Sequence, residues 1–338
     1  MRYLNTLYVT EHRAKVRRSK GSLVTTGPQG AQRVPLEAVD NVVLLGGGQI
    51  TTDAMAACAE RGINIAGLRR SGAVRFFVSR PQGGNVHLRV AQHRVSADSA
   101  ASLEISRHVV AAKLQSSRRM LLRWARDERG PSQVALRRRA EVIEARLQRV
   151  TSVRDPDHLR GIEGDAARAH FAGMSVVLAD SRFPFTQRNR RPPRDPVNAL
   201  LGFGYGLLLT EVAGAAEAVG LDPQVGFFHR PRSGRASLAL DLIEELRCMV
   251  DLFVVRTIRR REVVPADFTM TPGGATYLSD DGRTRILRLW ETAKSETVDH
   301  VLLRRRIERW ALPTVQATLL ARNLRGDLSA YPPYVHAT

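Results

Sequence analysis

Cysteine and lysine are both scarce in this chain of 338 residues. The two cysteines, Cys58 and Cys248, are too few for a disulfide framework or a cysteine-based zinc site, and this usage is typical of a reducing cytosol. The first residues, MRYLNTLYVTEHRAKV, carry charges throughout and contain no apolar run long enough for a signal peptide. We therefore expect a cytoplasmic protein.

Long uninterrupted hydrophobic runs are also missing. The nearest approach is LGFGYGLLLTEVAGAAEAVGL at 201–221, which Glu211 and Glu217 interrupt, so we expect a buried helix there and no membrane attachment. The GxGxxG and GxxxxGK[ST] spacings of nucleotide-binding loops are absent as well. The three glycines at 46–48 are therefore interpreted as a strand-to-helix turn rather than a phosphate cradle.

Negative charge is in deficit. The chain has 52 Lys and Arg against 33 Asp and Glu, a formal charge of +19, and arginine supplies nearly all of the positive charge. Such a surface attracts polyanions in a salt-dependent way, and the planar guanidinium suits phosphate. Nucleic acid is the leading partner class, although a GC-rich genome would also replace lysine by arginine.

The pattern of hydrophobic residues divides the chain into two parts. TLYVTE, AKVRRS, GSLVTT and RVPLEAVDNVVLL have the spacing of strands joined by hairpin turns, and ITTDAMAACAERG is predicted to be a helix before the strands INIAGL and AVRFFVS. Helical periodicity takes over from about residue 98. We predict an α+β fold with a small, mainly β domain at 1–85, a linker at 86–105 and a larger all-α domain at 106–338.

Carboxylates gather on one side of a predicted helix at 237–253, SLALDLIEELRCMVDLF. Leu242, Leu246, Met249 and Phe253 form a core-facing stripe, and the far side carries Asp241, Glu244, Glu245, Cys248 and Asp251. Asp241 and Glu244 are three residues apart, so they point the same way and could serve one ion. Acids near a helix start also complement the helix dipole, which is the simpler interpretation of this cluster.

Two further residues strengthen the interpretation as a metal site. His229 precedes the acidic helix in GFFHRPRSGR, and Glu163 stands between two glycines at the predicted start of another helix, GIEGDAARAHF. Glu163, His229 and Glu244 together would make an oxygen-rich site with one imidazole, suited to Mg²⁺ or Mn²⁺, although three such ligands could also hold Zn²⁺.

Arginine-rich loops and the C-terminal segment are the remaining features. We expect the loop at 187–200, QRNRRPPRDPVNAL, to be a flexible surface connection or a contact to the nucleic-acid backbone through its arginines, which are Arg188, Arg190, Arg191 and Arg194. Tyr331 and Tyr334 in SAYPPYVH could stack on a base or dock a partner, but we expect a loosely ordered terminus.

Several stretches, in this order, resemble the CRISPR-associated spacer-integration protein, the first of the two universal adaptation components. They are TLYVTE, GGGQITTDAMAACAERGINIAGL, GGNVHLRVAQHR, GIEGDAARAHF, the long block from Asn198 through Arg247, and a basic helical tail. The sequence departs from the family pattern where His170 stands for a usual Tyr, Leu246 for a common Phe and Cys248 for a common Pro.

The resemblance implies an N-terminal domain for dimerisation and partner contact, and a helical catalytic domain with Mg²⁺ or Mn²⁺ at Glu163, His229 and Glu244. Asp241 would support the site, Glu245 would be a weaker candidate, and Arg232 and Arg235 would lie beside the reacting phosphate. The implied activity is that of a metal-dependent DNA endonuclease and integrase, which joins the 3′ ends of short duplexes (protospacers) to a CRISPR repeat.

The implied assembly is a homodimer, two copies of which are bridged by a dimer of a small second adaptation protein in a heterohexamer. Two alternatives remain open on the sequence. One is a metal-dependent nuclease that cuts branched or single-stranded DNA without integration, and the other is a non-catalytic DNA-binding scaffold whose acids only cap helices.

Overall fold

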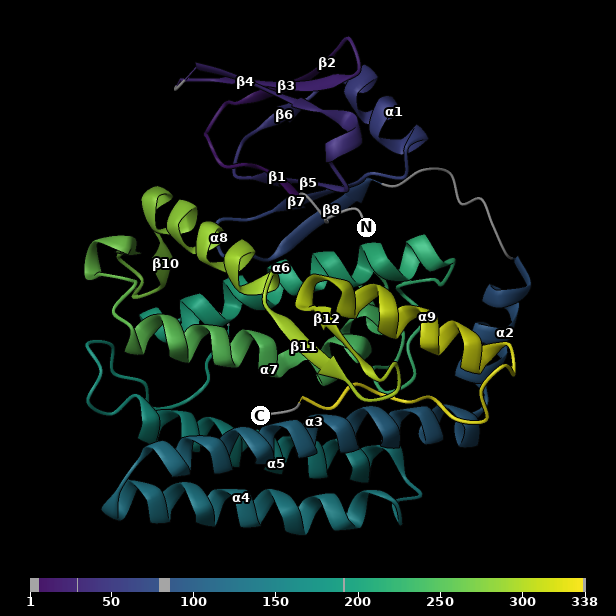
Figure 1. The fold of residues 1–338 in the computed structure, drawn as a ribbon, viewed down its shortest axis with the longest axis vertical. Coiled ribbons are helices and arrows are strands. Elements are labelled where there is room, and N and C mark those ends of the chain that lie inside the picture. The colour runs from purple at the N-terminus through teal and green to yellow at the C-terminus, as the bar shows by residue number, and fades with distance from the viewer. Residues whose placement is uncertain (1–5, 29, 79–85, 191, 337–338) are drawn as a thin grey trace.

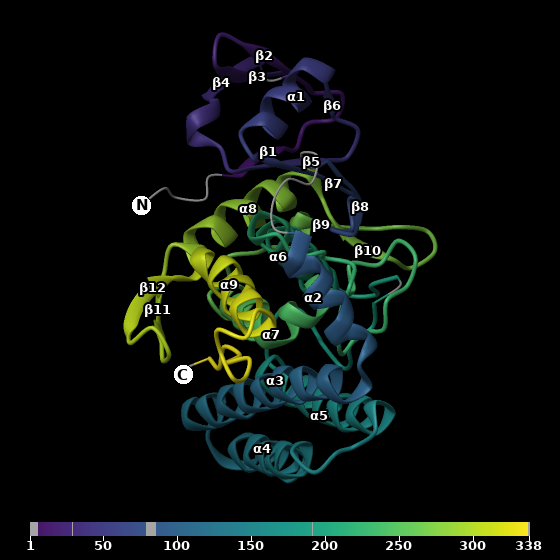
Figure 2. The same cartoon turned by 90° about the vertical axis from the view of Figure 1, so that its right-hand side faces the viewer.

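The computed structural model describes residues 6–28, 30–78, 86–190 and 192–336. As predicted, the fold is α+β: a strand-rich N-terminal part precedes a larger helical part, and the two stack along the long axis of the molecule (Figures 1 and 2). Arg191, one of the arginines expected to contact nucleic acid, lies outside the described residues, as does the stretch 79–85 at the end of the predicted first domain.

Two four-stranded sheets make up the N-terminal part, one in the order β1-β5-β7-β8 and the other in the order β4-β3-β2-β6. Where the sequence pattern predicted hairpins, β1, β5 and β7 pair in parallel. The antiparallel pairs among the described strands of this part are β7–β8, β2–β3 and β3–β4. The elements are β1 (Thr6–Val9), β2 (Lys15–Ser19), β3 (Ser22–Gly27), β4 (Gly30–Pro35), β5 (Asn41–Leu45), β6 (Gln49–Ile50), α1 (Thr52–Glu60), β7 (Asn64–Leu68) and β8 (Val74–Val78).

Strand β5 packs against both parts of the protein and so holds them together. All five of its residues are buried, and side chains alternate between the faces of a strand. Val42 and Leu44 therefore pack into the core of the N-terminal part, whereas Val43 and Leu45 join the core of the helical part. A continuous apolar strand of this kind is typical of a sheet covered on both faces.

The helical part begins immediately after residue 85. Residues 86–105, expected as a linker, form α2 and the first turns of α3, and Gly130 and Pro131 separate α3 from α4 as predicted. Its elements are α2 (Val86–Ala97), α3 (Ser99–Asp127), α4 (Gly130–Val150), α5 (Pro156–Val177), α6 (Pro196–Val219), α7 (Ser237–Arg259), β9 (Phe268–Met270), β10 (Thr276–Leu278), α8 (Asp280–Lys294), β11 (Thr297–His300), β12 (Arg305–Glu308) and α9 (Leu312–Leu324).

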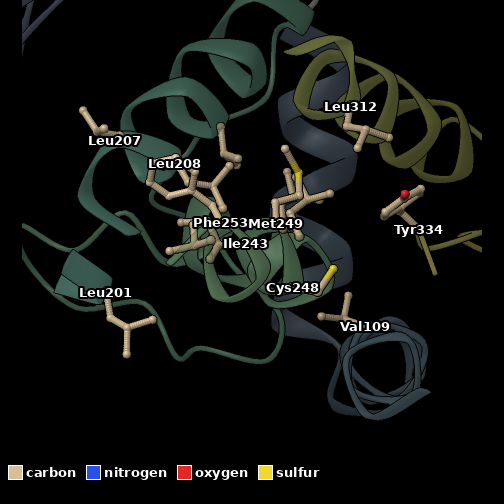
Figure 3. Close-up of a cluster of buried hydrophobic side chains, with 14 of the residues drawn as sticks. Val109, Leu201, Leu207, Leu208, Ile243, Cys248, Met249, Phe253, Leu312 and Tyr334 are labelled. Atoms are coloured by element: carbon tan, nitrogen blue, oxygen red, sulfur yellow. The ribbon is translucent and has the colours of Figure 1, made fainter. Parts of the chain in front are cut away.

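Helices α6 and α7 pack against each other, and their apolar side chains, among them Leu208, Ile243 and Phe253, lie together in a buried cluster (Figure 3). By length and composition α6 could cross a membrane, but 78% of its apolar window is buried inside the protein, in agreement with the expected core helix. In α7 the predicted stripe is buried, with Leu242 and Phe253 at 2% and 4% exposure. The acids on its far side are buried too, so this helix has an apolar face and a polar face that are both internal.

The C-terminal segment does not form the loosely ordered terminus that its composition suggested. Tyr331 and Tyr334 are 1% and 3% exposed, and the hydroxyl of Tyr331 and the backbone N–H of Tyr334 both donate to the Glu245 carboxylate. Gln316 on α9 donates to the same carboxylate at 2.9 Å. The expectation failed because a buried carboxylate on α7 supplies the acceptor that orders the segment, and neither tyrosine is available to stack on a base.

His336 closes this segment against α3. Its backbone N–H donates to the hydroxyl of Ser116 at 3.0 Å, and Arg119 donates to its carbonyl oxygen at 3.2 Å. Burial, together with the charges of nearby arginines, lowers the pKa of the His336 imidazole to about 4. The ring is therefore neutral in the folded protein at pH 7.

We predict that acid loosens the C-terminal segment through His336. Because its pKa is lower in the folded state than in the unfolded state, the unfolded chain binds more protons below about pH 6.5, so stability is lost as pH falls from there toward 4. Hydrogen exchange of residues 328–336 should accelerate more between pH 7 and pH 5, after correction for intrinsic rates, than exchange in β5. In His336→Gln the excess acceleration should disappear; if it persists, another group is responsible.

Candidate active site

Asp241 organises the loop that carries His229. Its carboxylate, 2% exposed on α7, accepts hydrogen bonds from the backbone N–H groups of Phe227, Phe228 and His229 at 2.6, 3.1 and 2.8 Å. It also meets Nδ1 of His229 at 2.7 Å. Both oxygens are engaged in this way, so Asp241 supports the histidine instead of sharing an ion with Glu244.

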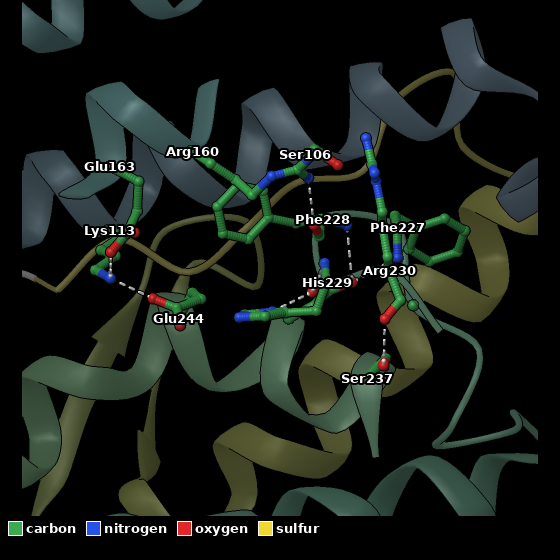
Figure 4. Close-up of polar contacts among 12 residues, drawn as sticks. Ser106, Lys113, Arg160, Glu163, Phe227, Phe228, His229, Arg230, Ser237 and Glu244 are labelled. Carbon is green, nitrogen blue, oxygen red and sulfur yellow. Dashed lines mark hydrogen bonds and ion pairs between the residues drawn. The ribbon is translucent and has the colours of Figure 1, made fainter. Parts of the chain in front are cut away.

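The contact between Asp241 and His229 determines which ring nitrogen is free. An ionised carboxylate can only accept, so Nδ1 carries the hydrogen and Nε2 presents its lone pair. Metal-binding histidines commonly have this arrangement, in which a carboxylate orients the ring. Figure 4 shows the His229 ring extending toward Glu244. The free nitrogen thus faces the acidic part of the site.

Glu163 and Glu244 come from different helices and meet at a single cation. Glu163 lies on the second turn of α5, which begins at Pro156 and not at Gly161 as the sequence suggested, because Asp155 caps the helix. Glu244 lies on α7 and is 3% exposed. The ammonium of Lys113 on α3 donates to both carboxylates (Figure 4). Two carboxylates separated in sequence are thereby brought to one point in space.

The residues present fit a divalent cation in chemistry. The ammonium of Lys113 bridges the carboxylates of Glu163 and Glu244, and the ring of His229, with its Nε2 lone pair, extends toward Glu244. Within the residues that the structure describes, no three His, Cys, Asp or Glu side chains are grouped so that they could hold a metal ion. The ammonium of Lys113 takes the position between Glu163 and Glu244.

Glu244 is ionised in the protein. Burial alone would raise the pKa of its carboxyl, but the charges of Arg247 and Lys113 hold it well below its usual range. Nε of Arg247 donates to Oε2 of Glu244 at 2.9 Å. The carboxylate is therefore available as a negatively charged ligand at neutral pH.

A polar cluster inside α5, α6 and α7 orients Arg247. Its guanidinium lies over the ring of Tyr205, 4.6 Å from the centroid. The hydroxyl of Tyr205 donates to Asp251, which also meets Nε2 of His170 at 3.1 Å. Burial, followed by the charge of Asp251, raises the pKa of Tyr205 far above its usual value, so the phenol stays protonated and keeps its donor. His170, where the family pattern has Tyr, contributes a hydrogen bond to this cluster.

Glu245 is excluded from the site by its orientation. It is fully buried on the next position of α7 and binds the C-terminal segment through Tyr331, Tyr334 and Gln316. The sequence weighed it as a weaker candidate ligand. Its contacts show a structural role instead.

The arginines expected near the substrate fall into two groups. Arg190, Arg194 and Arg232 are exposed, and Arg235 is half-buried. Arg188 is directed inward: it donates to Oδ1 of Asn198 at 2.7 Å and lies over Tyr205, 5.8 Å from the ring centroid. Burial lowers the pKa of Arg188 to about 10. These contacts give Arg188 a structural role within the protein.

Sequence reasoning missed Lys113, Arg247 and Arg160. Arg160 on α5 donates to the carbonyl oxygen of Phe228 at 3.3 Å and so ties the histidine loop to the helix that carries Glu163. Arg247 follows Glu244 by three residues, a spacing that signals a contact along a helix. For Lys113 the only signal was its rarity, since lysines occur at only four positions in the chain.

Fold and site together define the class: an α+β protein whose helical domain contains a carboxylate–histidine site with exposed arginines on nearby loops. The model of the family described as CRISPR associated protein Cas1 matches residues 7–292. This chain belongs to that family.

Two curated relatives match over nearly their whole length. A protein of Rhodospirillum rubrum named CRISPR-associated endonuclease Cas1 2 is 41% identical, with 98% of each chain covered, and one of Moorella thermoacetica named CRISPR-associated endonuclease Cas1 1 is 38% identical, also with 98% of each covered.

Solved structures share the fold. A casposase bound to an integration product has a TM-score of 0.85 at 21% identity, covering 99% of this chain and 95% of that one. A Cas1 protein from Thermotoga maritima has a TM-score of 0.82 at 20% identity, with 99% of each chain covered. At this level of identity the resemblance concerns the fold.

Proposed function

We propose that this protein is a metal-dependent DNA endonuclease and strand transferase that inserts short duplexes into a CRISPR array. Membership of the family and the endonuclease names of its relatives support the nuclease chemistry. The observation that carries the proposal is the convergence of Glu163 and Glu244, from separate helices, on the ammonium of Lys113, with the His229 ring extending toward Glu244 (Figure 4).

Each residue has a defined task in this proposal. Glu163, Glu244 and Nε2 of His229 would hold Mg²⁺ or Mn²⁺. When bound, such an ion neutralises charge on the attacked phosphate and lowers the cost of forming an alkoxide. Asp241 keeps the hydrogen on Nδ1 of His229, and Arg247 holds the Glu244 carboxylate. Nε2 offers a single lone pair, so it serves as a ligand or as a proton acceptor, but not as both at once.

Strand transfer conserves the number of phosphodiester bonds. A 3′-hydroxyl of the incoming duplex attacks a phosphorus atom of the repeat, a new phosphodiester forms, and the former 3′ oxygen leaves with a proton. Water in place of the hydroxyl gives hydrolysis, the endonuclease reaction. The same site therefore accommodates both activities, and the nucleophile decides between them.

The proposed partners are double-stranded DNA, a second copy of this chain and a small second adaptation protein in a heterohexamer in the cytoplasm. The formal charge of +19 supports DNA binding. Among solved structures of the same fold, one is titled as a Cas6-RT-Cas1–Cas2 complex, with a TM-score of 0.85 at 20% identity. A duplex with two ends requires two active sites, which supports more than one copy of the chain.

An integration assay tests the proposal. The purified protein and its small partner are supplied with a short duplex and a repeat-bearing plasmid, with Mg²⁺, Mn²⁺ or no metal. We expect joined product only with metal, and none above background with Glu163→Gln or His229→Ala. Cleavage of free DNA without joined product would favour the nuclease alternative, and DNA binding by the wild type without cleavage or joining would favour the non-catalytic scaffold. Joining that survives both substitutions would mean that Glu163 and His229 do not form the catalytic site.

Exposed and inward-facing arginines should differ in their effect on DNA binding. Arg190→Gln combined with Arg194→Gln is expected to weaken binding and to reduce the slope of log K against log salt by about one to two, because each lost phosphate contact releases about one counterion fewer. Arg188→Gln, the matched control, should lower the melting temperature and leave the slope unchanged. Equal salt slopes for the wild type, the double variant and Arg188→Gln would show that this loop does not contact DNA phosphates.

A further inference from the structure

A lysine ammonium occupies the centre of the candidate site. It belongs to Lys113 on α3, is 8% exposed, and donates to Oε1 of Glu163 and Oε2 of Glu244. Both partners are residues that the proposed function uses as metal ligands. The side chain of Glu163 is 21% exposed, so the site is open to solvent on the α5 side.

The choice of lysine at this position is not explained by composition. Only four of the 52 basic residues are lysines. Lys15 and Lys20 are exposed, whereas Lys294 is 3% exposed and bridges Glu211 and Glu291 at 2.8 Å from each. Both buried lysines thus lie between two carboxylates. An ammonium is a compact point charge on a flexible stem, which fits between two acids where a planar guanidinium does not.

We propose that Lys113 is the resident counter-ion of the metal-free site, and that its ammonium and a divalent ion occupy this position alternately. The inference rests on the metal centre of the proposed function. Two facing, partly desolvated carboxylates repel each other and require a cation, which the ammonium supplies when no metal is bound. The two ligands from α5 and α7 are thereby kept at one point before the metal arrives.

The ammonium of Lys113 and a divalent ion cannot both lie between Glu163 and Glu244, because both are positively charged. A divalent ion between Glu163 and Glu244 would stand within a few ångström of the ammonium, where repulsion in a poorly hydrated site is strong. The ammonium then leaves toward the open α5 side, while Arg247, which hydrogen-bonds to Glu244 and lies over Tyr205, stays in place. The apparent metal affinity is lowered by the fraction of molecules in which the ammonium holds the site.

Amine footprinting of the wild-type protein tests displacement directly. Reductive methylation followed by mass spectrometry is performed with and without Mn²⁺. We expect Lys113 to be protected without metal and to gain reactivity at least fivefold with Mn²⁺. Lys15 and Lys20 should react in both states and Lys294 in neither, which provides internal controls. Unchanged reactivity of Lys113 in a protein that demonstrably binds Mn²⁺ would overturn the inference.

Mn²⁺ titration by calorimetry provides a second measurement. Lys113→Met is expected to bind Mn²⁺ about tenfold more tightly, because the competing cation is gone. Arg247→Met is the matched control: it removes one positive charge next to the same carboxylate but does not vacate the position between the acids. It should not tighten binding. Equal tightening in both variants would mean that net charge alone is responsible, and the inference would fail.

The two proposals fail in different ways. If wild type and Glu163→Gln bind Mn²⁺ equally weakly, there is no metal centre at these residues and the proposed function is lost. If binding requires Glu163 but Lys113 neither gains reactivity nor alters the affinity when substituted, only the counter-ion inference is lost. The footprint needs no substitution, so it decides even if Lys113→Met fails to fold without metal.

Discussion

Replacing Glu244 by glutamine is expected to reduce metal-dependent DNA joining by at least about a hundredfold. Loss of a residue that merely orients a metal ligand typically costs 10- to 100-fold, and loss of a ligand should cost at least as much. Glutamine preserves the volume but removes the charge that Lys113 and Arg247 now neutralise. Initial rates of joined product at saturating Mn²⁺ provide the measurement.

Glu245→Gln is the matched control for that substitution. It makes the same chemical change at the neighbouring position of α7, where the carboxylate binds the C-terminal segment and not the site. We expect a lower melting temperature and a joining rate within about threefold of wild type, an effect of the size expected without loss of a ligand. If Glu244→Gln retains more than a tenth of the wild-type rate, this carboxylate is not a ligand.

Asp241→Ala is expected to have the largest effect on stability, with a loss of about 3–5 kcal/mol in the free energy of unfolding. The substitution leaves three backbone N–H groups of residues 227–229 without an acceptor, together with Nδ1 of His229. Each unsatisfied buried donor costs about 1–3 kcal/mol, and partial exposure to water of the loosened loop offsets part of the total. Urea denaturation at pH 7.5 provides the measurement.

Two comparisons separate this loop effect from a general loss of charge. Asp281→Ala removes an exposed acid from the first turn of α8 and should change stability by less than about 1 kcal/mol. Asp241→Asn retains one acceptor oxygen and should cost less than Asp241→Ala, while joining still falls because an amide no longer fixes the His229 hydrogen on Nδ1. Similar unfolding curves for Asp241→Ala and wild type would contradict the role assigned to this carboxylate.

Sequence patterns were sufficient for the elements of the fold. The alternating runs before residue 85 predicted most of the strands, because side chains on a strand alternate between faces whatever the strand pairs with. Their pairing was not predictable: β1, β5 and β7 are parallel neighbours although they are far apart in sequence. Local periodicity carries no information about which strands become neighbours, and the hairpin interpretation was wrong for these pairs.

The site shows the same division. His229, Asp241 and Glu244 were found because they are close in sequence and fall on one helix and its preceding loop, and Glu163 was added by its glycine-flanked pattern and the family resemblance. Their roles were less accessible. Only the folded chain shows that both carboxylate oxygens of Asp241 accept hydrogen bonds from backbone N–H groups, and that Glu245 accepts from the C-terminal segment.

Composition and periodicity were thus enough to establish an arginine-rich α+β chain with a helical acidic region, because these properties depend on residue type and on neighbours within a few positions. Tertiary structure alone decided that Lys113 lies between Glu163 and Glu244, that Arg188 turns inward and that the C-terminal tyrosines are buried. Each of these outcomes follows from burial. A charged or polar group removed from water must find a partner, and that partner is supplied by whichever distant segment packs against it.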